Sequence, residues 1–256
     1  MDKRIGAQLY TIRDFCKTAE DFDASMKKVS EIGYKTVQVS GIGPIPAEKV
    51  KEITDKYGLE IVCTHKGYGD YTDNLDKVIA DHKTMCCNIL GLGAMPQETR
   101  NDPELFVKII NPIAQKIKDN GLQFAYHNHA FEFAKMSDGN YIMDYLLENT
   151  DADNFKLIVD VYWLAIAGIN PSKFIKEYGL RIAAVHFKDL AVECGSCESS
   201  GIMAAIGEGN LDWDDIIAAC QEAGVEYALV EQDICPRDPF DCFKSSYNYL
   251  TAKGFI

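Results

Sequence analysis

The chain has 256 residues, 47% of them hydrophobic, which is enough for one sizeable core. Its formal net charge of −13, from 39 acidic and 26 basic residues, disfavours nucleic acid or an anionic membrane surface as the main partner. The sequence has no apolar stretch of the roughly 20 residues that a membrane span needs, and its first residues lack the apolar core of a signal peptide. Nine cysteines in a chain of this size are typical of reduced thiols. We therefore expect a cytoplasmic protein, with the export of a longer precursor left open.

Apolar runs alternate with amphipathic segments along the whole chain. Apolar runs bounded by turn residues predict strands near 4–9, 36–40, 60–64, 88–92, 122–127, 156–161, 182–187 and 227–231. Helical spacing, with prolines near the first turns and glycines past the ends, predicts helices near 20–32, 46–57, 72–86, 103–120, 140–149, 171–178, 212–223 and 239–251. Eight such units without a Gly-rich phosphate loop predict a single (β/α)₈ TIM barrel over 1–256, and a doubly wound open sheet is the alternative.

The connection 188–211, between the seventh strand and its helix, is long and rich in glycine, serine and cysteine. Long loops on this rim of a barrel commonly cover or shape an active site, so we expect 188–211 to form a mobile lid. Cys194 and Cys197 form a CxxC pair. A structural zinc ion needs a second pair or nearby histidines, which the sequence does not offer, so we expect neither a zinc nor a redox role for this pair.

Four predicted strands end in an imidazole or a carboxylate, namely His127, Asp160, His186 and Glu231. Each residue alone has an ordinary explanation, such as a helix cap for Asp160 or a core histidine for His186. Together, on adjacent strands of one barrel, they would be buried side by side as unpaired polar groups, which is costly. A divalent ion with mixed nitrogen and oxygen ligands removes that cost. We predict one such ion (Mn, Zn, Co or Mg) at the carboxyl rim, where these barrels keep their chemistry.

The fifth strand offers two candidates for the fourth ligand. His127 is the first polar residue after the apolar run, whereas Glu132 lies further along and would have to fold back from the loop. We rank His127 first as the ligand. Glu132 is then predicted to act as a general acid/base or as a hydrogen-bond partner of a liganding imidazole.

Other residues are predicted to lie on the same rim. Lys188 follows His186 by two positions and would stabilise a developing negative charge, although a surface lysine is an equal alternative. Core packing is the alternative for Trp163, and a solvated loop acid is the alternative for Glu208. The residues expected to contact the substrate are His65, Gln8, His129, Trp163 and Glu208.

The segments AYHNHAFEF, VDVYWLAIAG, VHFKD, GEGNLDW and VEQD, in this order, resemble the sugar phosphate isomerase/epimerase family of xylose-isomerase-like barrels. The resemblance covers essentially the whole chain and implies a TIM barrel with one divalent metal at the ends of strands five to eight. The usual ligand order in that family is Glu, Asp, His, Glu. This chain matches the last three with Asp160, His186 and Glu231, and it places His127 first. The YHNH pattern is similar to the inosose dehydratase and 3-keto-glycoside branch.

The resemblance implies an enzyme that acts on a small sugar or polyol by removing a proton next to a carbonyl, with Glu231 or an adjacent acid as the base. We expect an isomerase or epimerase, and a lyase of the dehydratase or 3-keto-glycoside kind is the alternative. The net charge of −13 and only five histidines disfavour a nuclease of the endonuclease IV type. A non-enzymatic sugar-binding protein is a further alternative. We expect a carbohydrate partner, no nucleic acid and no membrane, and the sequence leaves a homo-oligomer open.

Overall fold

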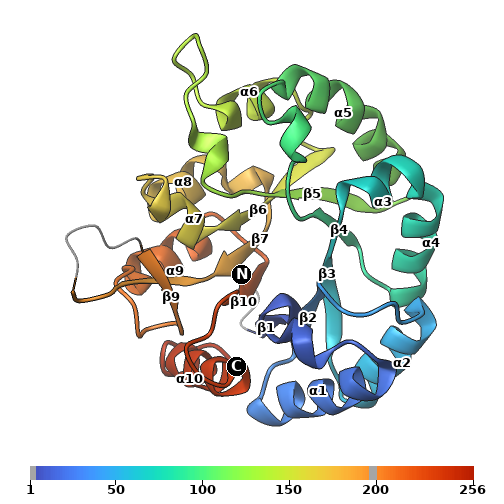
Figure 1. Ribbon diagram of the computed structural model, residues 1–256, viewed down its shortest axis with the longest axis vertical. Helices are drawn as coiled ribbons and strands as arrows, with labels where there is room; N and C mark the ends of the chain where they lie inside the picture. Colours follow the sequence, from blue (N-terminus) through green and yellow to red (C-terminus); the bar gives the residue numbers. More distant parts are fainter. Residues whose placement is uncertain (1–3, 196–200) are drawn as a thin grey trace.

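The computed structural model describes residues 4–195 and 201–256, and its centre is a closed barrel of parallel strands (Figure 1). The strands are β1 (Ile5–Gln8), β2 (Thr36–Val39), β3 (Glu60–Lys66), β4 (Ile89–Leu92), β5 (Gln123–His127), β6 (Phe155–Asp160), β7 (Ile182–Phe187) and β10 (Tyr227–Val230). Their order around the barrel is β1-β10-β7-β6-β5-β4-β3-β2, so the last strand pairs with the first. This closure confirms the predicted (β/α)₈ barrel and excludes the open sheet.

Helices form an outer ring around the strands (Figure 1). They are α1 (Ala19–Ile32), α2 (Ala47–Lys56), α3 (Tyr68–Asp73), α4 (Leu75–Met85), α5 (Pro103–Asp119), α6 (Ile142–Glu148), α7 (Val161–Ile166), α8 (Pro171–Tyr178), α9 (Trp213–Glu222) and α10 (Pro239–Ala252). Short 3-10 turns occupy Leu9–Phe15, Gln97–Thr99, Phe131–Phe133 and Gly179–Arg181. The helix predicted over 72–86 is two helices, because Asn74 leaves the helical region at φ −135°. In the described part of the chain, no helix is long and apolar enough to cross a membrane.

The predicted loop 188–211 contains a hairpin. β8 (Asp189–Val192) pairs antiparallel with β9 (Gly201–Ala204). The buried carboxylate of Asp189 accepts hydrogen bonds from the backbone N–H of Gly207 at 2.8 Å and Gly209 at 3.1 Å. It also accepts one from the indole N–H of Trp213 at 2.8 Å. These bonds hold the two ends of the segment together beside the start of α9, and the mobility of the lid stays a prediction. Residues 196–200 of the predicted lid, including Cys197, lie outside the described residues.

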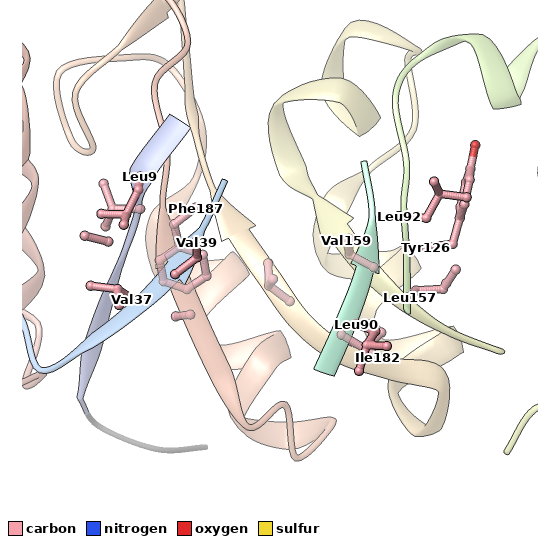
Figure 2. Close-up of a cluster of buried hydrophobic side chains, with 14 of the residues drawn as sticks. Leu9, Val37, Val39, Leu90, Leu92, Tyr126, Leu157, Val159, Ile182 and Phe187 are labelled. Atoms are coloured by element: carbon pink, nitrogen blue, oxygen red, sulfur yellow. The ribbon is translucent and has the colours of Figure 1, made fainter. Parts of the chain in front are cut away.

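Strand alternation decides which side chains face the barrel interior. Outward-facing residues join the large core between strands and helices, and Figure 2 shows Leu90, Leu92, Tyr126, Leu157 and Val159 in that core. A small apolar cluster fills the interior, and its members include Ala125, Ile158, Ala184 and Leu229. Each of these four residues is followed two positions later, on the same face of the chain, by a polar residue. These polar residues are His127, Asp160, His186 and Glu231. The alternation therefore directs the four polar residues inward, on top of a closed apolar floor.

Candidate metal centre

The four residues at the strand ends meet at one point. One potential ligand atom from each of His127, Asp160, His186 and Glu231 lies within 4.8 Å of the others, and all four side chains are buried. His127 Nε2 is 3.3 Å from Asp160 Oδ2, and His186 Nδ1 is 2.9 Å from Glu231 Oε2. Two imidazoles and two carboxylates at this spacing match the mixed ligand set of a divalent transition metal. We call these four residues the tetrad.

The imidazoles of the tetrad are each held through the nitrogen that faces away from its centre. Nδ1 of His127 lies 3.0 Å from the carbonyl oxygen of Gly93, an acceptor, so Nδ1 carries the hydrogen and Nε2 keeps a free lone pair. Nε2 of His186 lies 2.7 Å from Oε1 of Gln38, which leaves Nδ1 as the free lone pair. Hydrogen bonds of this kind fix the tautomer and orientation of metal-bound histidines. The residues present therefore fit a metal ion.

The carboxylates of the tetrad are positioned in the same way. Glu231 Oε1 accepts a hydrogen bond from the Gln8 side-chain amide at 2.6 Å. Asp160 Oδ1 accepts the backbone N–H groups of Tyr162 and Trp163 at 2.9 and 3.2 Å, so it is also the N-cap of α7. In both residues the second oxygen faces the imidazoles. The helix-cap explanation for Asp160 and its placement in the tetrad are therefore compatible.

Lys188 is buried beside the tetrad. Its Nζ lies 3.4 Å from Asp160 Oδ2, 3.3 Å from Glu231 Oε2 and 2.7 Å from Asp233 Oδ2. Burial favours the neutral amine, but the three carboxylates outweigh burial and raise the pKa of Lys188 above its ordinary value. Burial likewise opposes the charge of Glu231, yet Lys188 and His186 lower the pKa of that carboxyl well below its usual range. Lys188 is thus a fixed cation, and Glu231 is a fixed anion.

The two tetrad imidazoles differ in basicity. Burial lowers the pKa of His186, so that this ring is neutral. Burial also acts on His127, but the hydrogen bond and the charge of Asp160 offset it and raise the pKa of that ring. A bound metal cation would take the place of the proton on His127.

A cavity of about 340 Å³ opens above the tetrad. Its lining includes His127 and Glu231 of the tetrad, and Asp233. It also includes five further residues that the sequence predicts at the site, namely Gln8, His65, His129, Trp163 and Lys188. Pockets for small ligands commonly fall between about 300 and 1,000 Å³, so this cavity suits one small molecule.

Several groups around this cavity lack hydrogen-bond partners. Within the described residues, the unpaired buried atoms include His65 Nε2, His129 Nδ1, Trp163 Nε1 and Asp233 Oδ1, and all four residues line the cavity. An unsatisfied buried polar group costs about 1–3 kcal/mol, and native structures keep few of them. Four residues with such atoms around one cavity fit a site for a polar ligand.

Glu132 lies near the cavity but does not line it. The side chain is fully buried, with Oε1 accepting the Tyr126 hydroxyl at 2.5 Å and Oε2 accepting the His129 backbone N–H at 2.8 Å. Burial raises the pKa of Glu132 to about 6. The general acid/base role predicted for Glu132 lacks the access to substrate that such a role requires. Its hydrogen bond instead holds the backbone at His129.

Glu208 lies away from the tetrad. Its carboxylate forms an exposed ion pair with Arg237 at 2.6 Å and accepts a hydrogen bond from Ser245 at 2.5 Å. Glu208 does not line the cavity above the tetrad, so the predicted contact with substrate does not fit this arrangement. The pairing agrees with the alternative of a solvated loop acid, because Arg237 and Ser245 draw the carboxylate to the surface.

One residue in the site, Gln38, carries a signal that the predictions from the sequence did not use. Gln38 is a polar residue within the buried strand TVQV, as Gln8 is at the end of IGAQ. A polar side chain on a fully buried strand needs a partner, and for Gln38 that partner is His186. Asp233 follows Glu231 by two positions, on the same side of the chain, and it is an acid adjacent to Glu231 of the kind that the sequence analysis allows as the base.

Comparison with known proteins agrees with this geometry. Residues 26–238 match the xylose isomerase-like TIM barrel family. An inosose dehydratase from Lacticaseibacillus casei is 25% identical over 218 residues, covering 80% of this chain and 68% of the relative. An inosose dehydratase from Mesomycoplasma hyopneumoniae (strain 7448) is 23% identical and covers 90% of this chain and 88% of the relative. The crystal structure of a sugar phosphate isomerase/epimerase from Parabacteroides distasonis ATCC 8503 has a TM-score of 0.81 at 24% identity, covering 99% of both chains. This chain belongs to the xylose isomerase-like TIM barrel family.

Proposed function

We propose that this protein is a metal-dependent enzyme that removes a proton from the carbon beside a carbonyl of a polyhydroxylated ring and then eliminates an oxygen substituent. The proposal is carried by one cavity that is lined by two members of the buried tetrad, His127 and Glu231, and by four residues with unpaired polar atoms. The relatives named inosose dehydratase support elimination as the outcome.

A divalent ion bound by the tetrad would polarise the substrate carbonyl and so acidify the neighbouring C–H group. The base is one of two acids at the end of β10. Gln8 donates to one oxygen of Glu231, and Lys188 donates to the other, which faces His186 at the centre of the tetrad. Asp233 lines the cavity with a partly exposed side chain, and its buried Oδ1 has no hydrogen-bond partner among the described residues. Glu231 is therefore better suited to be a ligand, and Asp233, the adjacent acid, is better suited to accept the proton.

Lys188 and Trp163 would complete the reaction site. The Lys188 ammonium is fixed between Asp160, Glu231 and Asp233, where it can stabilise negative charge that develops on a substrate oxygen. The Trp163 ring lies 5.2 Å from Nζ of Lys188 and offers an apolar face to the C–H side of a sugar ring.

The distribution of bases favours elimination over two-base epimerisation. The carboxylates that line the cavity, Glu231 and Asp233, both belong to the segment at the end of β10. His127 lines the cavity as a member of the tetrad, and the two further imidazoles there are weak bases, since burial lowers the pKa of His129 to about 3 and that of His65 well below its ordinary value. Epimerisation by two bases needs one on each face of the substrate, whereas one carboxyl can serve elimination by taking the proton from carbon and then giving it to the departing oxygen, which leaves as water or an alcohol.

An isomerase is the second candidate. A single base at Asp233 could return its proton to the neighbouring carbon, which would convert an aldose to a ketose. The short distance of 2.7 Å between Asp233 and Lys188 favours this alternative, because the lysine would hold the substrate oxygen beside the carboxylate during both proton transfers.

The test is a product assay by NMR in D₂O with metal-loaded protein and a panel of inososes, 3-keto-glycosides and ketoses. Loss of a hydroxyl or alkoxy group identifies a lyase, and deuterium in an otherwise rearranged sugar identifies an isomerase. Asp233→Asn should lower the rate by at least about 100-fold, in the range of general base catalysis. Asp138→Asn, in an exposed turn, is the control. The proposal fails if no substrate exchanges its proton, or if Asp233→Asn is as active as wild type.

A further inference from the structure

The backbone around Asp233 is held by two side chains from the connection after β1. Residues 231–238, all within the described part of the chain, form neither helix nor strand, so regular hydrogen bonding does not fix this segment. The backbone N–H of Gln232 donates to the hydroxyl oxygen of Thr11 at 3.0 Å. Nη1 of Arg13 donates to the carbonyl oxygen of Asp233 at 3.0 Å. The two bonds therefore hold the chain just before and just after the Cα atom of Asp233.

Arg13 is itself held in one orientation. Its Nη1 also donates to the carbonyl oxygen of Tyr10 at 2.8 Å, and the guanidinium carbon lies 4.3 Å from the centroid of the Tyr10 ring. Gly41, in the segment after β2, has a left-handed backbone at φ 67°. A Cβ atom at Gly41 would lie 2.7 Å from the Tyr10 ring and 3.2 Å from Cβ of Arg13. Close packing on the stem and the contact with the ring thus direct the guanidinium toward Asp233.

We infer that Thr11 and Arg13 are positioning residues, which hold the backbone around Asp233 so that its carboxylate stays at the cavity, 2.7 Å from Nζ of Lys188. The inference rests on the proposed function, in which Asp233 accepts the proton. Neither Thr11 nor Arg13 is among the described residues that line the cavity, so both act through Asp233. A displacement of about 1 Å can cost about 100-fold in rate, and a base on an irregular segment depends on such supports.

The metal ligand Glu231 comes before this segment and has supports of its own. Its backbone N–H donates to the carbonyl oxygen of Phe187 at 3.0 Å, and its Oε1 accepts a hydrogen bond from Gln8 at 2.6 Å. Loss of the contacts from Thr11 and Arg13 should therefore displace Asp233 and leave the tetrad in place.

Variants that remove one hydrogen bond each test this inference. Arg13→Met keeps a long stem without a donor, and Thr11→Val keeps the shape of threonine without its hydroxyl. Each should fold as judged by circular dichroism and should lower kcat about tenfold or more, with KM and Zn²⁺ affinity within about twofold of wild type. Thr11→Ser restores the hydroxyl and should restore kcat to within about threefold of wild type. Arg237→Met removes an arginine of the same segment that pairs with Glu208 at the surface, and this control should behave as wild type.

A double variant shows whether Arg13 acts through the base. In Asp233→Asn, the further change Arg13→Met should lower the residual rate by less than about twofold, because the carboxylate that Arg13 positions is already absent. The inference is overturned if Arg13→Met lowers the rate by the same factor in both backgrounds, or if Thr11→Ser is as slow as Thr11→Val.

Amide hydrogen exchange tests the same contacts without turnover. The peptide 231–236 should exchange about tenfold faster in Arg13→Met and in Thr11→Val than in wild type, and unchanged exchange in both variants overturns the inference. The proposed function is judged separately, because it fails if Asp233→Asn is as active as wild type. If Asp233→Asn is slow while Arg13→Met and Thr11→Val are as fast as wild type, the function stands and the positioning role is refuted.

Discussion

Gln38→Leu should weaken metal binding without touching the metal ligands. Gln38 Oε1 accepts the Nε2–H of His186 at 2.7 Å, and both side chains are fully buried. That bond leaves Nδ1 of His186 directed at the tetrad, 2.9 Å from Glu231 Oε2. Leucine has a similar size but no acceptor. In the variant the Nε2–H would stay buried without a partner, and the ring would be free to turn its other nitrogen toward the centre.

Two estimates agree on the size of the effect. Loss of the outer partner of a metal-bound histidine typically lowers metal affinity about 10- to 100-fold, which corresponds to about 1.4–2.7 kcal/mol. Leaving one buried donor unpaired costs about 1–3 kcal/mol. The assay is competition between protein and a chelator for Zn²⁺ and for Mn²⁺, with circular dichroism to check that the barrel is folded.

Gln123→Leu is the matched control for this experiment. Gln123 begins β5, at the end of the barrel opposite the tetrad, and its side-chain amide donates to backbone carbonyl groups, including that of Asp153. This control should bind metal like the wild type. The reasoning is refuted if Gln38→Leu folds normally and keeps its metal affinity within about twofold of wild type. In that case the hydrogen bond from His186 to Gln38 does not orient His186 as a metal ligand.

Four further predictions follow from the site. Asp160→Ala and His186→Ala should each abolish metal retention while the barrel still folds, because both side chains lie at strand ends above the apolar floor. Full metal content of either variant after dialysis would exclude the tetrad as the metal site. His127→Ala should lower metal affinity whereas Glu132→Gln should leave metal bound, and a metal titration in which the two variants behave alike would contradict the ligand assignment. Because burial raises the pKa of Glu132 from 4.5 to about 6, the folded protein binds this proton more tightly than the unfolded chain. The contribution of Glu132 to stability should therefore fall by about 2 kcal/mol in all as the pH rises through both pKa values, with about 1.3 kcal/mol of that fall between pH 4.5 and pH 6. Denaturant titrations at several pH values should show that the free energy of unfolding depends less on pH in Glu132→Gln than in wild type. An unchanged pH dependence would contradict this role of Glu132. Glu208→Gln should leave metal affinity and turnover unchanged, because the carboxylate of Glu208 pairs with Arg237 at the surface. A marked loss of turnover would show instead that Glu208 contributes to the reaction.

The sequence by itself determined the barrel and the tetrad. Both depend on local rules: apolar runs and helical spacing alternate eight times, and strand alternation places His127 on the face of Ala125 and Asp160 on the face of Ile158. Parallel strands of one barrel end at a common rim, so residues in the same position at successive strand ends must meet. No knowledge of distant contacts was needed to bring these residues together.

The tertiary structure alone decided the surroundings of the tetrad. Gln38 and His186 are 148 positions apart, and only closure of the barrel brings them into contact. The direction of Glu132 depends on the Tyr126 hydroxyl and on the path of the loop after β5, which strand alternation does not specify beyond the end of the strand. Glu208 is drawn to Arg237, and the hairpin in 188–211 is organised by Asp189. Each of these features is a contact between parts of the chain whose relative position no local pattern encodes.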